Sequence, residues 1–148
     1  MGSLPVEYAT CYFNWFDVTY FPWPALKLHS DFPAQLNLVT GYGAGFVEVN
    51  RERREGSLVL LPDGPVLEWN VGTFDQIDER AIAGLLGHRP EIVLLGTGAR
   101  QRFPHTRVGA ALSGARIGLD VMDTPAACRT YNILAAEGRR VLAALLPT

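Results

Sequence analysis

The chain has 148 residues, of which 48% are hydrophobic and 19% are charged, and its formal net charge is −2. Such a chain can bury a core of its own as one ordinary domain, and its composition excludes an intrinsically disordered protein. The near-neutral charge gives no electrostatic reason to expect a nucleic-acid partner. No apolar run approaches the about 20 residues that a membrane-spanning helix requires, so we expect no transmembrane segment.

The first 24 residues form a distinct aromatic segment. We divide the chain into an aromatic-rich N-terminal extension over residues 1–24 and a single α/β domain over residues 25–148. The extension lacks the basic start and the clean apolar stretch of a signal peptide. Three alternatives stay open: the extension packs on its own domain, it contacts a partner such as a second copy of the chain in a homodimer, or it is partly disordered. Its rings belong to Tyr8, Tyr12, Phe13, Trp15, Phe16, Tyr20, Phe21 and Trp23.

The next block alternates apolar and polar residues with the period of two that is typical of strands. A glycine-rich bend covers residues 41–45, and the Pro-Asp-Gly-Pro run at 62–65 is a strong turn signal. The block therefore predicts a β-hairpin layer that adds to the rest of the domain. Its predicted strands cover residues 36–40, 46–49, 53–61 and 66–69.

From residue 75 onward, predicted helices and strands alternate. Asp75 or Asp78 is expected to cap the first helix, Thr106 the second, and Asp123 or Thr124 the third. Alternation of this kind predicts an α/β domain with helices on both faces of a sheet, and the pattern alone favours a parallel sheet. The predicted helices cover residues 77–86, 106–116 and 124–137, and the predicted strands cover residues 91–95, 117–122 and 141–146.

Two polar turns follow the buried strands of this α/β region. Because the carboxyl ends of parallel strands meet at one edge of a sheet, we expect the two turns to share a cleft. Backbone N–H groups, hydroxyls and guanidinium groups in such a cleft would suit an anion. The candidate ligand-binding residues are Gly96, Thr97, Gly98, Arg100, Arg102, Asp123, Thr124, Cys128, Arg129 and Asn132.

The glycine turn has a functional and a structural interpretation. It lacks the third glycine of a dinucleotide-binding fingerprint and the Gly-Lys-Ser/Thr of a P-loop, so both of those motifs are excluded. Its amides could still hold an anion with help from Arg100 and Arg102. Alternatively, the glycines only supply a positive φ in a tight turn. Asp123 is similarly open, because it can cap a helix but would repel an anion.

Cys128 is the one candidate nucleophile of this region. A thiol near a helix start and beside Arg129 would be acidic, and His105 could serve as its base. The alternative is a small buried side chain that packs the helix on the sheet. Asn132 lies mid-helix, where an amide usually bonds something specific.

The two cysteines of the chain bear on metals and on cellular location. Cys11 and Cys128 lie far apart, with no CxxC and no Cys/His pair at metal-binding spacing, so we expect neither a metal nor a cofactor. Two isolated thiols fit a reduced compartment, and we expect a cytoplasmic protein.

Several short motifs together resemble those of a widespread bacterial and archaeal protein family of unknown function. The resemblance covers residues 26–147 and does not extend to the aromatic extension. The motifs are LVTGYG at 38–43, EVN at 48–50, EGS at 55–57, LPDGP at 61–65, LLGTG at 94–98, RFP at 102–104, MDT at 122–124 and ACRTYN at 127–132.

This resemblance implies both a fold and a function. The fold is α/β, with three layers around a central mixed β-sheet in which one strand runs antiparallel to the others. The family is related to a mitochondrial factor in the assembly of respiratory complex I. It thereby implies a non-enzymatic interaction or assembly protein, with respiratory-complex subunits or assembly factors as partners. The alternative function is a small anion- or metabolite-binding module, or an uncharacterised enzyme, that uses the cleft between residues 96–102 and 123–132.

Overall fold

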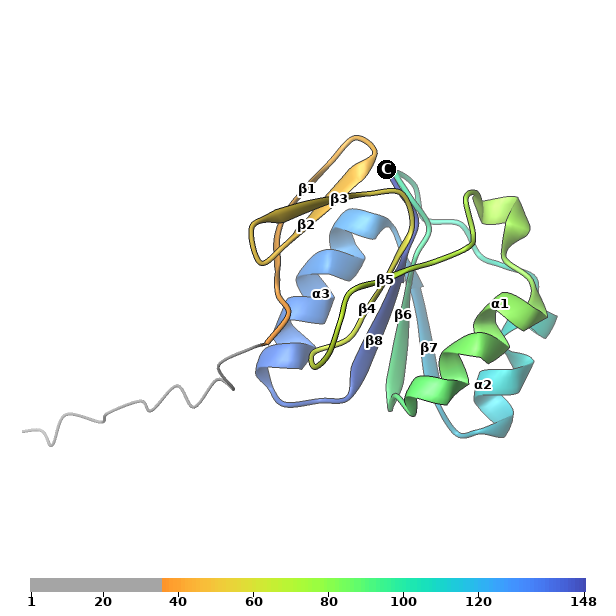
Figure 1. Cartoon of the computed structure of the whole chain (residues 1–148). Coiled ribbons are helices and arrows are strands. Elements are labelled where there is room, and N and C mark those ends of the chain that lie inside the picture. The colour runs from red at the N-terminus through yellow and green to blue at the C-terminus, as the bar shows by residue number, and fades with distance from the viewer. Residues whose placement is uncertain (1–35) are drawn as a thin grey trace, which may run out of the picture. The chain divides into compact units, whose positions relative to one another are not determined.

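The computed structural model describes residues 36–148, and the extension predicted over residues 1–24 lies outside them (Figure 1). Strands and helices follow one another much as the sequence pattern indicates. The strands are β1 (Val39–Gly43), β2 (Phe46–Val49), β3 (Glu52–Glu55), β4 (Leu58–Leu60), β5 (Leu67–Glu68), β6 (Ile92–Gly96), β7 (Gly118–Met122) and β8 (Val141–Leu145). The helices are α1 (Glu79–Ala83), α2 (Ala110–Gly114) and α3 (Thr124–Ala136), with 3₁₀ helices η1 (Phe74–Gln76), η2 (Gly84–His88) and η3 (Thr106–Gly109).

Five strands form the main sheet, in the order β5-β4-β8-β6-β7. β6 runs parallel to β8 and β7, whereas β4 is antiparallel to both of its neighbours, β8 and β5. The sheet is therefore mixed, with one strand opposed to the others, as the family resemblance implied. The parallel sheet favoured by the alternation alone is wrong. The hairpin between β4 and β5 makes that pair antiparallel, whereas the direction of β4 against β8 comes from a pairing between segments distant in the chain.

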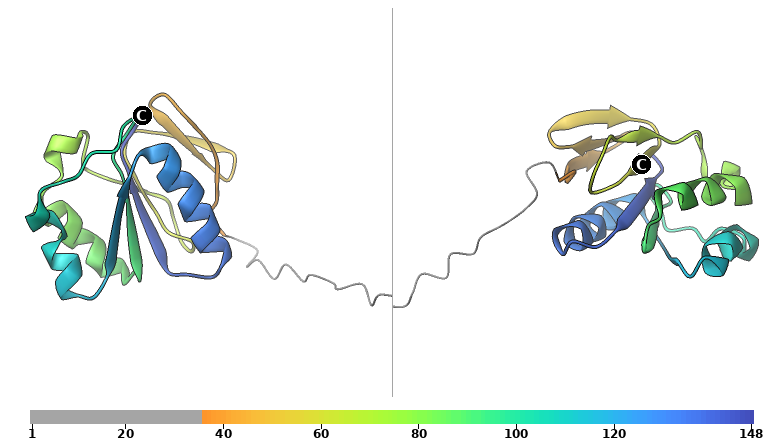
Figure 2. Two further views of the ribbon diagram at one scale, coloured as in Figure 1. Left: turned by 180° about the vertical axis from the view of Figure 1, so that it is seen from behind. Right: turned by 60° about the horizontal axis from the view of Figure 1, so that its bottom comes forward.

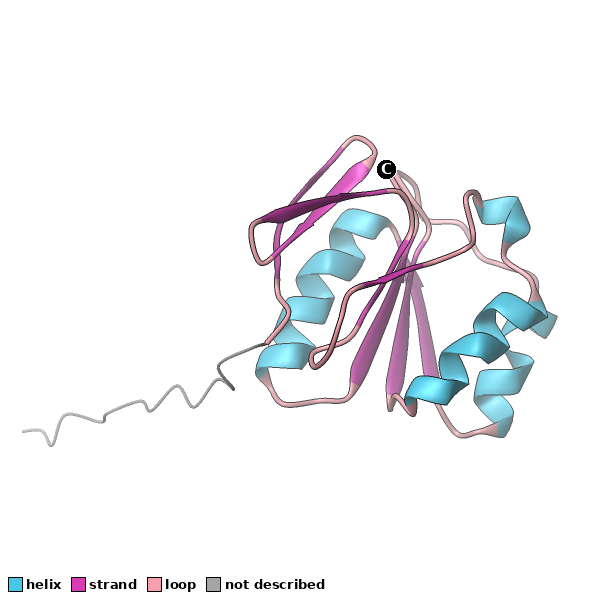
Figure 3. Cartoon of the chain, viewed as in Figure 1, coloured by secondary structure: helices cyan, strands magenta, loops and turns pink. Residues whose placement is uncertain are grey.

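Helices cover both faces of this sheet, which confirms the layered α/β fold. α3 lies on one face and α1 and α2 on the other (Figures 1 and 2). The small antiparallel sheet β1-β2-β3 adds a further layer on the α3 side, as the colouring by secondary structure shows (Figure 3). Alternate residues of β6 serve the two cores, because Leu94 packs toward α3 while Val93 and Leu95 pack toward α1 and α2.

Several predicted elements are shorter or divided in the structure. The strand predicted over 53–61 is two strands in different sheets, because Gly56 adopts a left-handed φ of 82° and redirects the chain. The helix predicted over 77–86 begins after Asp78, which caps it, and becomes 3₁₀ at Gly84. The helix predicted from Thr106 is 3₁₀ before it is α, and His105 caps it instead. None of the described helices is long and apolar enough to cross a bilayer.

Candidate functional site

The two predicted turns meet at the carboxyl ends of β6 and β7. Parallel pairing aligns Gly96 with Met122 at the ends of these strands. Beyond them, Thr97 N donates to Met122 O and Thr124 N donates to Gly98 O, each at 2.9 Å. The structure thus brings residues 96–98 and 122–124 into direct contact through the backbone.

The protein's own atoms fill the space between these turns. Thr124 is fully buried, and its hydroxyl donates to Leu146 O at 2.7 Å and accepts from Gly98 N at 2.9 Å. A Cβ on Gly96 would lie 2.9 Å from both Thr124 Oγ1 and Leu145 Cδ2. Gly98 has a φ of 92°, which a side chain rarely adopts. Close packing and backbone conformation therefore account for both glycines without a ligand.

The start of α3 has no backbone donors left for an anion. Asp123 caps the helix, because its Oδ1 accepts from Ala126 N at 2.7 Å and its carbonyl accepts from Ala127 N at 2.9 Å. Pro125 has no N–H, and Thr124 N is already bonded to the glycine turn. The amides that the sequence offered to an anion are thus satisfied internally. The guanidinium groups of Arg100, Arg102 and Arg129 remain as side-chain partners for an anion at the carboxyl ends of these strands.

Cys128 is buried, and an acidic thiol is not what the structure shows. Its side chain is 1% exposed, and burial raises the pKa of the thiol to about 12 although the nearby charge of Arg129 acts in the opposite direction. The Arg129 guanidinium is at the surface, where it donates to Tyr42 Oη at 2.8 Å. His105 uses Nδ1 to accept from Arg107 N at 3.3 Å. The packing alternative therefore holds for Cys128.

Burial makes Cys128 a slow reactant. With a pKa near 12, about one thiol in ten thousand is ionised at pH 8, and the thiolate is the reactive form. In a Cys11→Ser variant, we expect alkylation of Cys128 by iodoacetamide at pH 8 to be at least about a thousandfold slower in the folded protein than in denaturant. Mass spectrometry over time measures both rates, and comparable rates would contradict the buried thiol.

Asn132 holds the small sheet on α3. Its Nδ2 donates to Val39 O at 2.7 Å, and its Oδ1 accepts from Val39 N at 2.8 Å. The oxygen and the nitrogen of the side-chain amide are therefore both paired with the backbone of one residue of β1, which is the specific bonding expected of a mid-helix amide. The neighbouring Tyr131 is fully buried and donates its hydroxyl to Asn37 O at 3.0 Å. Asn132 is thus placed as a connector between layers.

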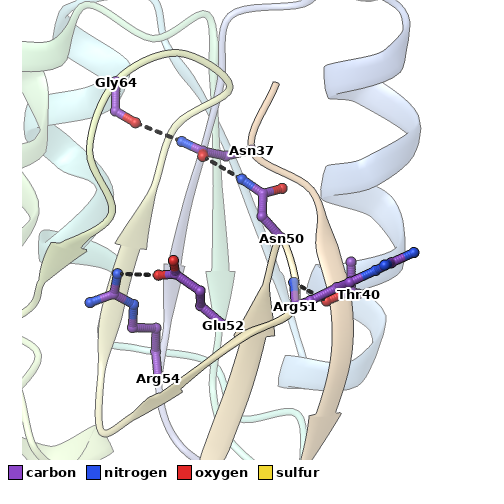
Figure 4. A network of polar contacts seen from close by, with 7 residues as sticks. All are labelled: Asn37, Thr40, Asn50, Arg51, Glu52, Arg54 and Gly64. Atoms are coloured by element: carbon purple, nitrogen blue, oxygen red, sulfur yellow. Dashed lines mark hydrogen bonds and ion pairs between the residues drawn. The ribbon is translucent and has the colours of Figure 1, made fainter. Parts of the chain in front are cut away.

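Asn37, which is not among the site residues predicted from the sequence, joins two segments of the chain through its side-chain amide. It is 8% exposed, and its Nδ2 donates to Gly64 O at 2.7 Å and to Leu61 O at 3.0 Å. Its Oδ1 accepts from Asn50 Nδ2 at 3.0 Å, so the side chain joins the 61–64 turn to the β2–β3 hairpin (Figure 4). The available signal was a lone amide inside the apolar run of residues 36–39, where an unpaired polar group would be costly.

Residues 99–107, here called the basic loop, form the exposed part of this edge. The loop is held firmly: Thr97 Oγ1 donates to Arg100 O at 2.7 Å and accepts from Arg102 N at 3.0 Å. Gln101 Nε2 donates to Val121 O at 2.9 Å, and the Arg102 guanidinium lies 4.5 Å from the centre of the Phe74 ring. Phe103 nevertheless remains 75% exposed. Phe103 is not among the site residues predicted from the sequence, although the RFP motif at 102–104 is part of the family resemblance.

A separate cavity of about 550 Å³ lies at the opposite ends of the strands, where β6 and β8 begin. None of the predicted site residues lines it. Its walls include Leu36, Pro62, His88, Pro90 and Arg139.

Comparison with known proteins gives one family match. The model of the family described as protein of unknown function (DUF498/DUF598) matches residues 39–146. The chain is 38% identical over 122 residues to NADH dehydrogenase [ubiquinone] 1 alpha subcomplex assembly factor 3 of Rattus norvegicus. That match covers 81% of this chain and 65% of the rat protein, so the chain spans less than two thirds of its relative's length.

Several solved structures resemble this one, among them two from Bordetella. A crystal structure from Bordetella parapertussis has 44% identity and a TM-score of 0.72, and the match covers 78% of this chain and 99% of that chain. A solution NMR structure from Bordetella pertussis, described as an Mth938-like domain, has 38% identity and a TM-score of 0.69. It covers 82% of this chain and 92% of that chain.

Proposed function

The chain belongs to the DUF498/DUF598 family, and from that premise we propose that it acts without catalysis, as a docking protein in the assembly of a respiratory NADH dehydrogenase complex. The name of the rat relative supports the assembly role. The satisfied amides around Asp123 and the buried thiol of Cys128 support docking over chemistry. We also propose, as the sequence suggests, that the protein works in the cytoplasm with respiratory-complex subunits or assembly factors as partners.

The observation that carries this proposal is the exposure of Phe103 on the basic loop, which hydrogen bonds hold in place. If a partner covered the exposed phenyl ring of Phe103, a large apolar surface would be removed from water, which favours binding. Hydrogen bonds from Thr97 and Gln101 already order the basic loop, so docking costs little conformational entropy. The basic loop carries three arginines and no carboxylate. The matching partner surface is acidic and has an apolar pocket for the ring.

We expect a Phe103→Ala variant to fold normally and to fail in assembly. The ring makes little contact within the chain, so stability should change by less than about 0.5 kcal/mol. A strain that lacks the gene is complemented with the wild-type or the variant chain. Assembled NADH dehydrogenase is then measured by native gel electrophoresis, at equal protein levels. The variant should give several-fold less assembled complex than the wild type.

The matched control is Ile133→Ala, which removes another exposed apolar side chain, 60% exposed on α3, and should leave assembly unchanged. Normal assembly with Phe103→Ala, or in the strain without the gene, would contradict the proposal. A thermal stabilisation by inorganic phosphate that disappears in Arg102→Ala would instead support the anion-binding alternative.

A further inference from the structure

The outer edge of β7 is open. β7 pairs with β6 on one side, and no described strand lies on the other. The Gly118 amide and the Met122 carbonyl both bond toward β6, at 3.2 and 2.9 Å. Because alternate residues of a parallel strand direct their peptide groups to opposite sides, those of Leu119 and Val121 face away from β6.

One of these outward-facing groups already binds an amide. Gln101 Nε2 donates to Val121 O at 2.9 Å, and Gln101 is exposed to solvent. A primary amide is chemically close to a peptide N–H. Within residues 36–148, the Leu119 amide, the Leu119 carbonyl and the Val121 amide have no hydrogen-bond partner. The outer edge of β7 therefore offers hydrogen-bond donors and acceptors at the spacing of a β-ladder. One of these acceptors, Val121 O, is bonded to the Gln101 side chain, which a peptide N–H could displace.

The other described sheet edges carry features that prevent strand pairing. Every residue of β3 is exposed and charged, and β5 has only two residues. β1 has a register shift, and the Asn132 side chain occupies the outward-facing N–H and C=O of Val39. Charge, shortness, irregular register and cover are the usual protections of an edge strand. β7 has five residues and neither proline nor lysine, so it is the least protected of these edges against strand pairing.

We propose that β7 binds an extended segment of a partner protein as an additional strand. Asp120 determines which charge the partner segment should carry, because this carboxylate is exposed and makes no ion pair among the described residues. A segment with arginine or lysine beside Asp120 gains a cross-strand charge pair. On the other face, Leu119 and Val121 are half-buried and favour apolar neighbours. A second copy paired about Asp120 would bring two carboxylates together, which is unfavourable.

The test titrates the full chain with the synthetic segment acetyl-Thr-Val-Arg-Val-Thr-amide. Amide chemical shifts and hydrogen exchange are followed at Leu119 and Val121. We expect saturable changes at these two amides in the low millimolar range. Gln101→Ala should strengthen binding because it frees Val121 O. Replacing the central arginine of the segment by glutamate should weaken binding about fivefold, and Asp120→Lys should reverse that preference.

A second variant separates backbone pairing from other contacts. Val121→Pro removes an outward-facing N–H but none of the hydrogen bonds to β6, so the ladder with β6 is kept and binding should be lost. Unchanged amides at Leu119 and Val121, or equal affinity for the arginine and glutamate segments, would overturn the proposal. Changes at these amides on raising protein concentration without any segment would assign the edge to a second copy instead. The experiment needs no assembly partner, so its outcome is independent of the docking role proposed for Phe103.

Discussion

Replacing Thr124 by valine should lower the free energy of unfolding by about 3 kcal/mol, although the two side chains have nearly the same shape. The Thr124 hydroxyl is buried where β6, β8 and α3 meet, and it bonds to both Gly98 N and Leu146 O. Valine leaves these two buried backbone groups without partners, and each such group costs about 1–3 kcal/mol. Chemical denaturation followed by circular dichroism measures the loss.

Thr124→Ser is the matched control for this prediction. Serine keeps the hydroxyl and removes one methyl group, so its cost should be near 1 kcal/mol. The difference between the two variants isolates the hydroxyl from the packing of the methyl group. If valine and serine destabilise the protein equally, the Thr124 hydrogen bonds do not stabilise this corner, and another feature must explain why the residue is buried.

Much of the fold follows from residue patterns that carry their own physical signal. The alternation in Phe46–Val49 and the apolar runs at 92–96 and 141–145 locate strands because each pattern matches the faces that the strands bury. The Asp123-Thr124-Pro125 run locates the start of α3 for the same kind of reason. The direction of β4 could not be predicted locally, because strand polarity depends on which strand it meets far along the chain.

The candidate site was harder to predict, because the same residue types serve packing and binding. A glycine turn suits an anion, but at Gly96 it makes room for Thr124. Whether the amides of a turn are free depends on partners distant in sequence, such as Leu146 for the Thr124 hydroxyl. Phenylalanine is more often buried than exposed, and only the three-dimensional structure shows that Phe103 is exposed. The local sequence therefore predicted that the two turns meet at the ends of β6 and β7, but it did not show which of their polar groups are free to bind a ligand.

Replacing Asn132 by leucine should detach the small sheet from α3. The side-chain amide of Asn132 pairs with both the N–H and the C=O of Val39, a residue that is 7% exposed. Leucine is similar in size and can bond to neither group, so the expected loss of stability is about 2 kcal/mol. Because β1 borders only β2 within its sheet, the loss should fall on local opening of β1–β3.

Native-state hydrogen exchange resolves where that loss falls. Amides in Val39–Gly43 and Phe46–Val49 should exchange faster in Asn132→Leu, while those in Ile92–Gly96 should keep their protection. Asn132→Asp retains an acceptor for Val39 N but places a negative charge near Val39 O, so it should give an intermediate effect. Uniform loss of protection in both sheets would show that α3 and the small sheet open as one cooperative unit. In that case the hydrogen bonds between Asn132 and Val39 would contribute to the stability of the whole domain and not only to that of the small sheet.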